Sequence, residues 1–492
     1  MTAQNTTPPA VTVAEAVAFG LREQRAGRLD IAEKIYHKVL QAEPGHHLAL
    51  HLVGMIAYRR KHYAQAIPWI ERAIALHPTE ANYRNTLGAC LRALGRLDAA
   101  IAAYERAVEL APDNGQVHLN LGNALKEARE YDRAIACYER ACALSPPTAA
   151  LHAGYAHALA DAGRPADAIR HYRAALALQP DDAKIHFGHA LALLMDGRLA
   201  EGWPEYEWRL ESHARSMGVH REFAQPRWTG GDLAGQRMLV HCEQGFGDAL
   251  QFIRYAPLLA NRGARLIVEC RPELKTLLAG MPGIDSVLAR GEALPAFDTH
   301  CPLLSLPAAF GTTLETIPAD VPYLRVNETA AAGCRARLSE VNGLKVGLVW
   351  SGSPTNKLNL RKACPLELLA PLAAIAGVRF VSLQKGPAAA SRGATFAMTD
   401  WTADLADFSD TAGLVSNLDL VISVDTAVAH LAGALAKPVW LLLGSEGDWR
   451  WLLERADSPW YPTMKIFRQR RPGDWAGVLA RVRSELEVLA AG

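Results

Sequence analysis

The stretch LDLVISVDTAVAHLAGALAKPVWLLLG, residues 418–444, sets the pattern for the C-terminal half of the chain. Its apolar start, Leu418 to Val424, is rich in β-branched residues and predicts a buried strand of a parallel sheet. The helix that follows would be capped by Asp425 or Thr426 and would end before Lys437-Pro438. The stretch therefore predicts a strand–helix–strand unit of an α/β fold.

The turn between that strand and its helix is where we expect a ligand. In open α/β sheets, ligands bind beyond the carboxyl ends of the strands. The start of a helix offers free N–H groups and the positive end of a dipole, which together attract anions. The pattern indicates a phosphate site, and so a nucleotide. The alternative is an ordinary unit without a ligand, because capping residues occur at any helix start.

The composition is that of an ordinary globular protein. The chain has 492 residues, enough for about three domains, and half of them are hydrophobic. A formal net charge of +1 gives no reason to expect nucleic acid as a partner. We find neither a transmembrane run nor a signal-peptide pattern in the sequence. The eight cysteines are scattered without a CxxC pair, which favours reduced thiols and a cytoplasmic protein.

The first 211 residues repeat with a period of 34. The register is kept by a closing proline, by a small residue in each of two helices, and by an aromatic or large apolar residue four positions after the second small one. Such a pattern is typical of the tetratricopeptide repeat (TPR), and about six units fit between residues 10 and 211. The prolines are at 44, 78, 112, 146 and 180, the alanines at 32, 66, 100, 134 and 168, and the glycines at 20, 54, 88 and 122.

Arrays of this kind stack into a superhelix whose concave face binds an extended peptide or another protein. We therefore expect a protein acceptor in this groove. The amide Asn120, just before Gly122, resembles the asparagine-lined groove of O-GlcNAc transferase repeats. A solvated helix face is the alternative for any one of these polar residues. The acceptor-binding candidates are Asn85, Arg92, Asn120 and Asn123.

The rest of the chain alternates strands and helices in two blocks. An irregular segment, 212–236, is predicted as a linker, and the blocks cover residues 237–328 and 343–490. Two such blocks indicate two doubly wound lobes with a cleft between them. The extra aromatic residues Trp203 and Trp208 predict that the last repeat docks on the domain that follows it.

Four loops at strand carboxyl ends are predicted to face that cleft. Glycines in the first loop, Glu243 to Asp248, allow a ligand to approach the backbone closely. Small hydroxyls beside cations in the second loop suit phosphate oxygens. The alternatives are a helix-start carboxylate for Asp248, a polar surface loop for Lys357 and a buried, satisfied histidine for His430. The donor-binding candidates are Gly247, Ser351, Ser353, Lys357, Arg361, Gln384, Lys385, Asp425, Thr426, Ala427 and His430.

Three motifs in these loops resemble the heptosyltransferase-like branch of the GT-B glycosyltransferases. They are GFGD at 245–248, SGSPTNKLNLRKACP at 351–365 and DTAVAHLA at 425–432. Ala427 stands where the heptosyltransferase pattern has glycine. Repeats fused to such a unit look more like the bacterial TPR-glycosyltransferases, some of which glycosylate flagellin. The resemblance implies a TPR α-solenoid followed by a two-lobed GT-B domain.

The resemblance also implies an inverting transfer from a nucleotide sugar to a protein hydroxyl. Asp248 is the candidate base that takes the proton of the acceptor. The helix start at Thr426, with Arg361 and Lys385, would stabilise the leaving phosphate. We expect no metal and no cofactor other than the nucleotide sugar. The alternatives are a lipid or polysaccharide acceptor, with the repeats serving assembly, or a TPR scaffold whose GT-B domain is degenerate.

Overall fold

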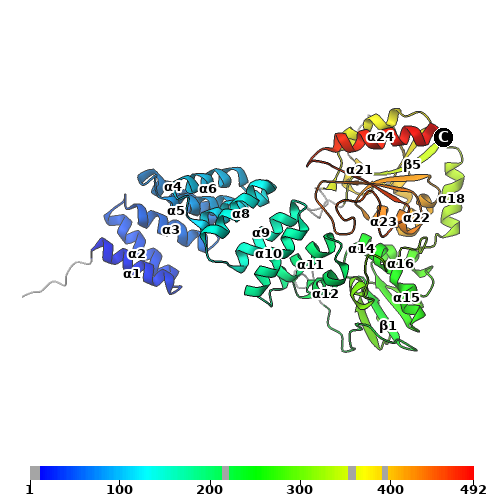
Figure 1. The fold of residues 1–492 in the computed structure, drawn as a ribbon, viewed down its shortest axis with the longest axis horizontal. Helices are drawn as coiled ribbons and strands as arrows, with labels where there is room; N and C mark the ends of the chain where they lie inside the picture. The colour runs from blue at the N-terminus through cyan, green and yellow to red at the C-terminus, as the bar shows by residue number, and fades with distance from the viewer. Residues whose placement is uncertain (1–11, 213–220, 353–361, 391–396, 492) are drawn as a thin grey trace, which may run out of the picture. The chain divides into compact units, whose positions relative to one another are not determined.

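A computed structural model of the chain describes residues 12–212, 221–352, 362–390 and 397–491. It divides into two compact units, residues 1–180 and 181–492, which are described separately. The first unit is a stack of helix pairs, seen from blue to cyan-green in Figure 1. Its helices are α1 (Val13–Arg25), α2 (Leu29–Ala42), α3 (His47–Arg59), α4 (Tyr63–Leu76), α5 (Ala81–Ala93), α6 (Leu97–Leu110), α7 (Gly115–Glu127), α8 (Tyr131–Leu144), α9 (Ala149–Asp161) and α10 (Pro165–Leu178).

The repeat residues have the packing roles that the period predicts. A side chain at Gly54 would put its Cβ 2.6 Å from Ile70, and one at Gly88 would lie 2.8 Å from the ring of Tyr104. The two helices of a pair therefore approach closely only because these positions lack a side chain. Each repeat proline in this unit lies two residues beyond the end of the second helix of its pair. The prediction of a TPR array is confirmed by this geometry.

The sixth helix pair belongs to the second unit, where its last helix packs against the α/β part. The indole of Trp203 is buried, and its Nε1 donates to the carbonyl of Thr312 at 2.9 Å. Its ring meets that of Trp449 edge-on at 5.4 Å. The predicted docking of this repeat is therefore confirmed. The three helices are α11 (Ala183–Met195), α12 (Leu199–Tyr206) and α13 (Arg209–Ser212).

The first sheet has four parallel strands in the order β3-β2-β1-β4. Part of the predicted linker lies along its edge, where Arg227 bridges to His300 of β4 and the buried Trp228 donates its backbone N–H to the same residue. The elements are β1 (Arg237–His241), α14 (Phe246–Phe252), η1 (Ile253–Tyr255), α15 (Ala256–Asn261), β2 (Arg265–Cys270), α16 (Pro272–Ala279), β3 (Ser286–Ala289), β4 (Thr299–Pro302), η2 (Leu303–Ser305) and α17 (Leu306–Ala309).

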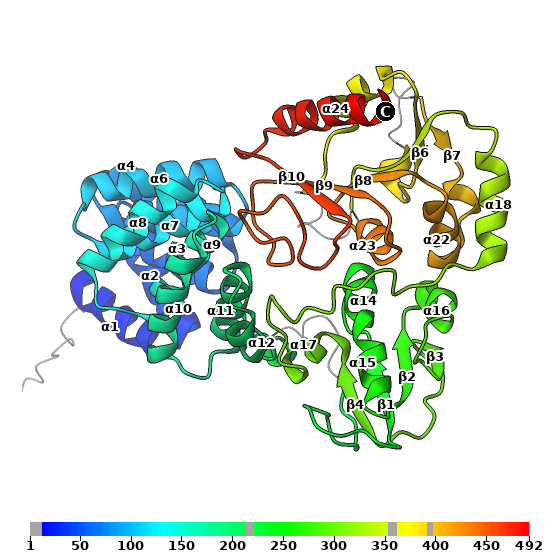
Figure 2. The same cartoon turned by 45° about the vertical axis from the view of Figure 1, so that its right-hand side comes forward.

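The second sheet has six parallel strands in the order β10-β9-β8-β5-β6-β7. Figure 2 shows it apart from the first sheet, with α14 and α23 next to each other between the two. The elements are α18 (Glu328–Leu338), β5 (Leu344–Val349), α20 (Leu366–Leu369), η3 (Ala370–Ala374), β6 (Val378–Ser382), α21 (Pro387–Ala390), β7 (Thr399–Asp400), η4 (Thr402–Asp404), α22 (Phe408–Ser416), β8 (Leu420–Val424), α23 (Ala427–Ala434), β9 (Val439–Leu443), β10 (Met464–Arg468) and α24 (Trp475–Ala491).

The central strands are buried along their length, as their sequences predict. All five residues of β8 are buried, because helices cover the sheet on both faces. On one face, Val346 and Leu348 of β5 pack with Val478 and Val482 of α24. Parallel strands of this kind end at one edge of their sheet, so the loops that leave them collect there.

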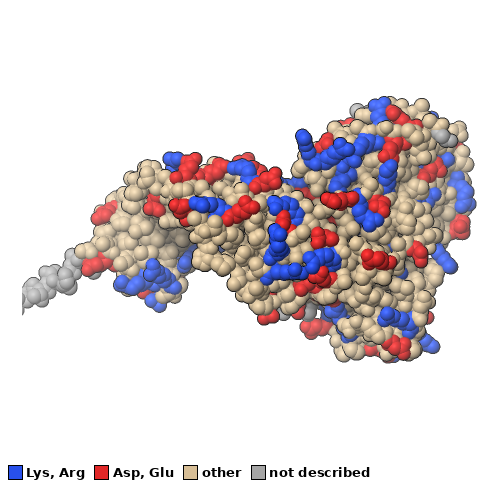
Figure 3. Space-filling model, viewed as in Figure 1, with Lys and Arg blue, Asp and Glu red and all other residues tan. Residues whose placement is uncertain are grey.

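Charged side chains are spread over the surface. On the face drawn in Figure 3, Lys and Arg alternate with Asp and Glu, in line with the net charge of +1. Among the helices of the described residues, none has the length and apolar character needed to cross a bilayer.

Candidate functional site

The loop at the carboxyl end of β8 brings Asp425 to the space between the sheets. Thr426 occupies the N-cap position of α23 with extended backbone, but its side chain makes no capping hydrogen bond. Its hydroxyl instead lies 3.0 Å from that of Ser423, and Asp425 pairs with Lys362. Thr426 is therefore the N-cap residue, as predicted, but the expected side-chain capping bond is not formed. The first N–H groups of α23 carry no side-chain cap.

The loop after β1 brings Asp248 to the same place. Gly245 is the N-cap of α14, and the carboxylate of Asp248 accepts its backbone N–H at 3.0 Å. Asp248 is thus a helix-start carboxylate, one of the two interpretations that its position in the sequence left open. It also forms an ion pair with Arg450, which lies in the loop after β9.

Arg450 joins the two lobes through three acceptors. Its guanidinium donates to Asp248, to the carboxylate of Asp448 at 3.2 Å and to the side-chain oxygen of Gln251 at 3.1 Å. Only 13% of its side chain is exposed. Burial alone would lower the pKa of Arg450, but Asp448 and Asp248 outweigh it and raise the pKa above its ordinary value.

Lys362 lies between two carboxylates, those of Asp425 and Asp448. Its ammonium group donates to Asp425 and lies 3.3 Å from Asp448. Burial alone would lower the pKa of Lys362, but Asp425 and Asp448 outweigh it and raise the pKa above its ordinary range. Arg450 and Lys362 in turn hold the pKa of Asp448 well below its usual value. Lys362, Arg450 and Asp448 are therefore charged at neutral pH.

His430 closes the cluster on the side of α23. Its Nδ1 lies 2.9 Å from the hydroxyl of Tyr461, and its Nε2 lies 3.9 Å from the carboxylate of Asp425. Burial lowers the pKa of His430 to about 4, so the ring is neutral at pH 7. Gly247 packs directly on it, because a Cβ there would lie 2.9 Å from the imidazole.

We call this set the ion cluster. It brings three carboxylates and two cations around a neutral histidine, so its described part has one negative charge more than positive charges. Two helix starts, those of α14 and α23, pack together at the cluster. Its members are Asp248, Lys362, Asp425, His430, Asp448 and Arg450.

The other predicted donor-binding residues have mixed placements. Gln384 is buried, and its side-chain oxygen accepts the N–H groups of Trp350 and Ser351 at 3.1 and 2.9 Å, so it holds the second loop in place. The ammonium of Lys385 donates to the carbonyl of Leu405 and does not join the ion cluster. The predictions for Ser353, Lys357 and Arg361 fall outside the described residues.

Sequence reasoning missed three members of the cluster. Lys362 follows the predicted Arg361 directly, at the end of the quoted motif. Asp448 and Arg450 lie in the tryptophan-rich stretch after β9, which the four predicted cleft loops do not include. The alternation of acid, aromatic residue and base in Asp448-Trp449-Arg450 is a sequence signal that could have indicated these two charged residues. In the structure the guanidinium of Arg450 lies 4.2 Å from the centre of the Trp449 ring.

The four predicted groove residues of the first unit fall into two kinds. The amide of Asn120 donates to that of Asn85 at 2.8 Å, which links two neighbouring repeats. Asn123 instead accepts the hydroxyl of the buried Tyr138 at 2.8 Å, and Arg92 forms an ion pair with Glu127. Among the described residues, the side chains of Asn85 and Asn120 bond only to other side-chain amides. Asn123 and Arg92 instead bond to Tyr138 and Glu127, which belong to the helices of the repeats.

No group of three or more His, Cys, Asp or Glu side chains in the described parts of the chain is arranged to hold a metal ion. The expectation of a metal-free site stays a prediction, because the loop of residues 353–361 lies outside the description.

Comparison with known proteins identifies the repeats. The tetratricopeptide repeat model matches residues 86–149 and 155–206, and the model of the anaphase-promoting complex, cyclosome, subunit 3 matches residues 26–107. Among solved structures, a MamA protein is 24% identical and covers 35% of this chain and 94% of its own, with a TM-score of 0.31. YrrB, a TPR protein with an unusual peptide-binding site, is 19% identical over 36% of this chain and 91% of its own, with a TM-score of 0.32.

One curated relative extends beyond the repeats. Protein FlbA of Caulobacter vibrioides is 28% identical over 318 residues, which are 59% of this chain and 52% of FlbA. The chain thus spans about half the length of this relative. Because the repeats occupy less than half of the chain, a match over 59% of it includes part of the region that follows them.

Proposed function

We propose that the two parallel sheets form a GT-B glycosyltransferase that uses a nucleotide sugar, and that the TPR groove presents a protein hydroxyl to it. The observation that carries this proposal is the ion cluster. It assembles at strand carboxyl ends of both sheets, where Asp248 of one lobe pairs with Arg450 of the other. Arg450 and Lys362 share Asp448, and Lys362 also pairs with Asp425. A cleft between two lobes with polar groups at strand ends is where a nucleotide binds in such folds.

The charges around α23 suit the phosphates of the donor. The first N–H groups of α23 have no side-chain cap, and Lys362 and Arg450 supply positive charge beside them. Because the described cluster has a net negative charge, a diphosphate needs further cations. The sequence has Lys357 and Arg361 in the loop just before Lys362. Binding would draw Lys362 and Arg450 from their aspartates to the phosphate oxygens.

Asp248 then acts as the base. Its carboxylate is engaged by the guanidinium of Arg450 and by the backbone N–H of Gly245. Once Arg450 turns to the donor phosphates, Asp248 is free to take the proton of the acceptor hydroxyl. The hydroxyl oxygen forms a bond to the anomeric carbon, and the bond from that carbon to the phosphate breaks. The electron pair leaves on the nucleoside diphosphate, whose charge Lys362 and the α23 N–H groups stabilise.

The test is a thermal-shift screen of the full chain with UDP, GDP, ADP and CMP and their sugars. Ten of the eleven tryptophans lie between residues 181 and 492, so tryptophan fluorescence follows the second unit. A ligand at 100 times its dissociation constant stabilises the folded protein by about 2.7 kcal/mol. We expect one nucleotide to shift the wild type but not Asp425→Ala. If none of them shifts the wild type, the transferase proposal is wrong and the scaffold alternative takes its place.

Two further measurements separate the finer proposals. Turnover that survives a chelator supports a metal-free reaction, and its loss would contradict it. The alternative is a lipid or polysaccharide acceptor. It predicts that a variant with alanine at Asn85 and Asn120 still transfers sugar to a small acceptor. It also predicts that the wild type modifies no protein. Modified protein, for which flagellin is the first acceptor to try, favours the proposed reaction.

A further inference from the structure

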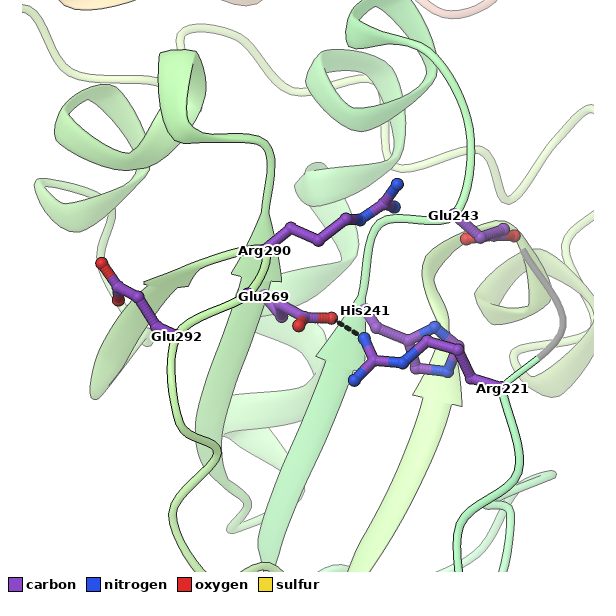
Figure 4. A pocket seen from close by; sticks show the side chains of 7 residues that line it. Arg221, His241, Glu243, Glu269, Arg290 and Glu292 are labelled. Atoms are coloured by element: carbon purple, nitrogen blue, oxygen red, sulfur yellow. Dashed lines mark hydrogen bonds and ion pairs between the residues drawn. The ribbon is translucent and has the colours of Figure 1, made fainter. Parts of the chain in front are cut away.

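A second polar site lies at the carboxyl ends of β1 and β2, beside the end of β3. It is a pocket of about 200 Å³, and none of its lining residues belongs to the ion cluster. Figure 4 shows Arg221, His241 and Glu269 side by side over the strand ends, with Glu243 and Arg290 above them. The lining residues are Arg221, His241, Glu243, Glu269, Arg290, Gly291 and Glu292.

Two buried atoms in the lining have no partner within the described ranges. They are Nε2 of His241 and Oε2 of Glu243, and each of these residues is 6% exposed. A buried polar atom without a hydrogen bond costs free energy, which a bound polar group would recover. A carboxylate oxygen requires a donor, and a neutral imidazole nitrogen either donates or accepts.

Most charges around the pocket already have counter-charges. Glu269 pairs with Arg221, Glu292 pairs with Lys275, and the other oxygen of Glu243 accepts from Arg209 at 2.8 Å. Among the described lining residues, Arg290 is then the one charge without a counter-charge.

His241 and Arg290 are the two lining groups without an ion pair among the described residues. Burial, reinforced by the neighbouring His300 and Arg221, lowers the pKa of His241 to about 3, so its ring is neutral. Arg290 lies at the rim and is exposed. It donates to the backbone carbonyl of Cys242 at 2.5 Å and, within the described ranges, forms no ion pair.

We propose that this pocket binds one neutral sugar residue. A sugar hydroxyl can donate to the free oxygen of Glu243 and accept from His241 or Arg290, and vicinal hydroxyls can do both at once. A neutral ligand leaves the ion pairs of the wall undisturbed, whereas an anion would lie against the free carboxylate oxygen of Glu243 and a cation against Arg290. The volume is below the ~300–1,000 Å³ of sites for drug-sized ligands, which limits the occupant to one small ring.

The inference goes beyond the proposed transferase activity and does not depend on it. The donor would bind at the ion cluster, which shares no residue with this pocket, and sugar binding is measured without any nucleotide. The two sites are close along the chain, since Glu243 lines the pocket and Asp248, in the first turn of α14, belongs to the cluster.

The test is calorimetric titration of the full chain with free glucose, galactose, mannose and N-acetylglucosamine, together with inorganic phosphate as an anionic probe. We expect at least one sugar to bind at millimolar concentration and phosphate not to compete with it. His241→Phe keeps the ring shape and removes both nitrogens, and it should weaken binding roughly tenfold. Arg290→Ala should weaken binding severalfold.

Arg290→Ala keeps the test decisive if His241→Phe fails to fold. This exposed side chain donates only to a backbone carbonyl among the contacts of the described chain, so its loss should not affect folding. The matched control is Arg265→Ala, an exposed arginine at the amino end of β2, which should bind like the wild type. The proposal is overturned if no sugar binds, if both pocket variants bind like the wild type, or if phosphate binds and displaces the sugar.

Discussion

Asp248 and Arg450, 202 positions apart in the chain, form an ion pair that fastens the first sheet's leading helix to a loop of the second sheet. The pair is mostly buried, with 18% and 13% of the two side chains exposed. A buried pair of this kind adds little stability over apolar residues, but removal of one partner leaves a charge without compensation. We therefore predict different losses of stability for replacement of Arg450 and of Asp248.

Replacing Arg450 by glutamine should destabilise the second unit by about 3–5 kcal/mol, because it removes the cation shared by Asp248 and Asp448. Asp248→Asn should cost clearly less, since Arg450 keeps Asp448 and Gln251 and the new amide still accepts a hydrogen bond. Denaturant unfolding followed by tryptophan fluorescence measures both. In the proposed reaction Asp248→Asn should also slow transfer ~10²–10⁴-fold. Equal stability losses would show that the guanidinium is not shared as the structure has it.

Gly247 should tolerate no side chain. A Cβ at this position would lie 2.9 Å from His430 and 3.7 Å from Ala427, so Gly247→Ala should cost about 1–3 kcal/mol through overpacking. Gly444→Ala is the matched control, because nothing lies within 4 Å of a Cβ there. It should change stability by less than about 0.5 kcal/mol. A Gly247→Ala protein as stable as the control would show that the helix starts of α14 and α23 are farther apart than described.

His430 should make the second unit sensitive to acid. Its pKa falls from an ordinary 6.5 to about 4 in the folded chain, so the unfolded chain binds more protons between these values. Stability is then fully present above pH 6.5 and is lost as pH falls toward 4. This one group contributes a loss of about 2 kcal/mol between pH 7 and pH 5.

The comparison is the pH dependence of the thermal midpoint in wild type and His430→Gln, with a replacement of the exposed His62 as control. The variant should lose less stability than the wild type on going from pH 7 to pH 5, even if its midpoint at pH 7 is lower. Parallel curves for the two proteins would assign the acid sensitivity elsewhere, with His241 the next residue to test.

The predictable part of this molecule is the part set by local patterns. The 34-residue period predicted the helix pairs because the close packing of Gly88 on Tyr104 recurs with the same spacing in the first four helix pairs, with Ile70 in place of the tyrosine in the second. The ends of the strands could also be predicted, so we expected Asp248, Asp425 and His430 near one another. All three belong to the ion cluster.

The remaining members depend on tertiary packing. Arg450 reaches Asp248 from a loop after β9 that has no repeat, no glycine motif and no regular period. The expected side-chain capping bond is not formed for a similar reason, because Thr426 and Asp425 have partners from outside the helix start, Ser423 and Lys362. A local rule could not foresee these competing contacts.

The division of the chain at residue 180 gives a prediction about truncation. A protein of residues 181–492 keeps Trp203 against Trp449 and Thr312, so it should unfold in one cooperative transition with buried tryptophan emission. Removal of residues 1–211 instead deletes this indole from the core of the second unit, and that protein should aggregate or unfold without a clear transition. If both truncated proteins melt at the same temperature, the sixth repeat is not part of the second unit.

The groove amides should separate binding from folding. Asn123 accepts the hydroxyl of the fully buried Tyr138, so Asn123→Ala leaves that hydroxyl unpaired and should destabilise the first unit by about 1–3 kcal/mol. Asn120 is half-buried and bonded only to the side chains of Asn85 and Gln116 among its described neighbours, so Asn120→Ala should leave the midpoint nearly unchanged. Far-UV circular dichroism measures both, because Trp69 is the one tryptophan in residues 1–180. If the groove binds a protein, Asn120→Ala should weaken binding of a flagellin acceptor severalfold. A variant that binds as tightly as the wild type would move the contact surface away from these amides.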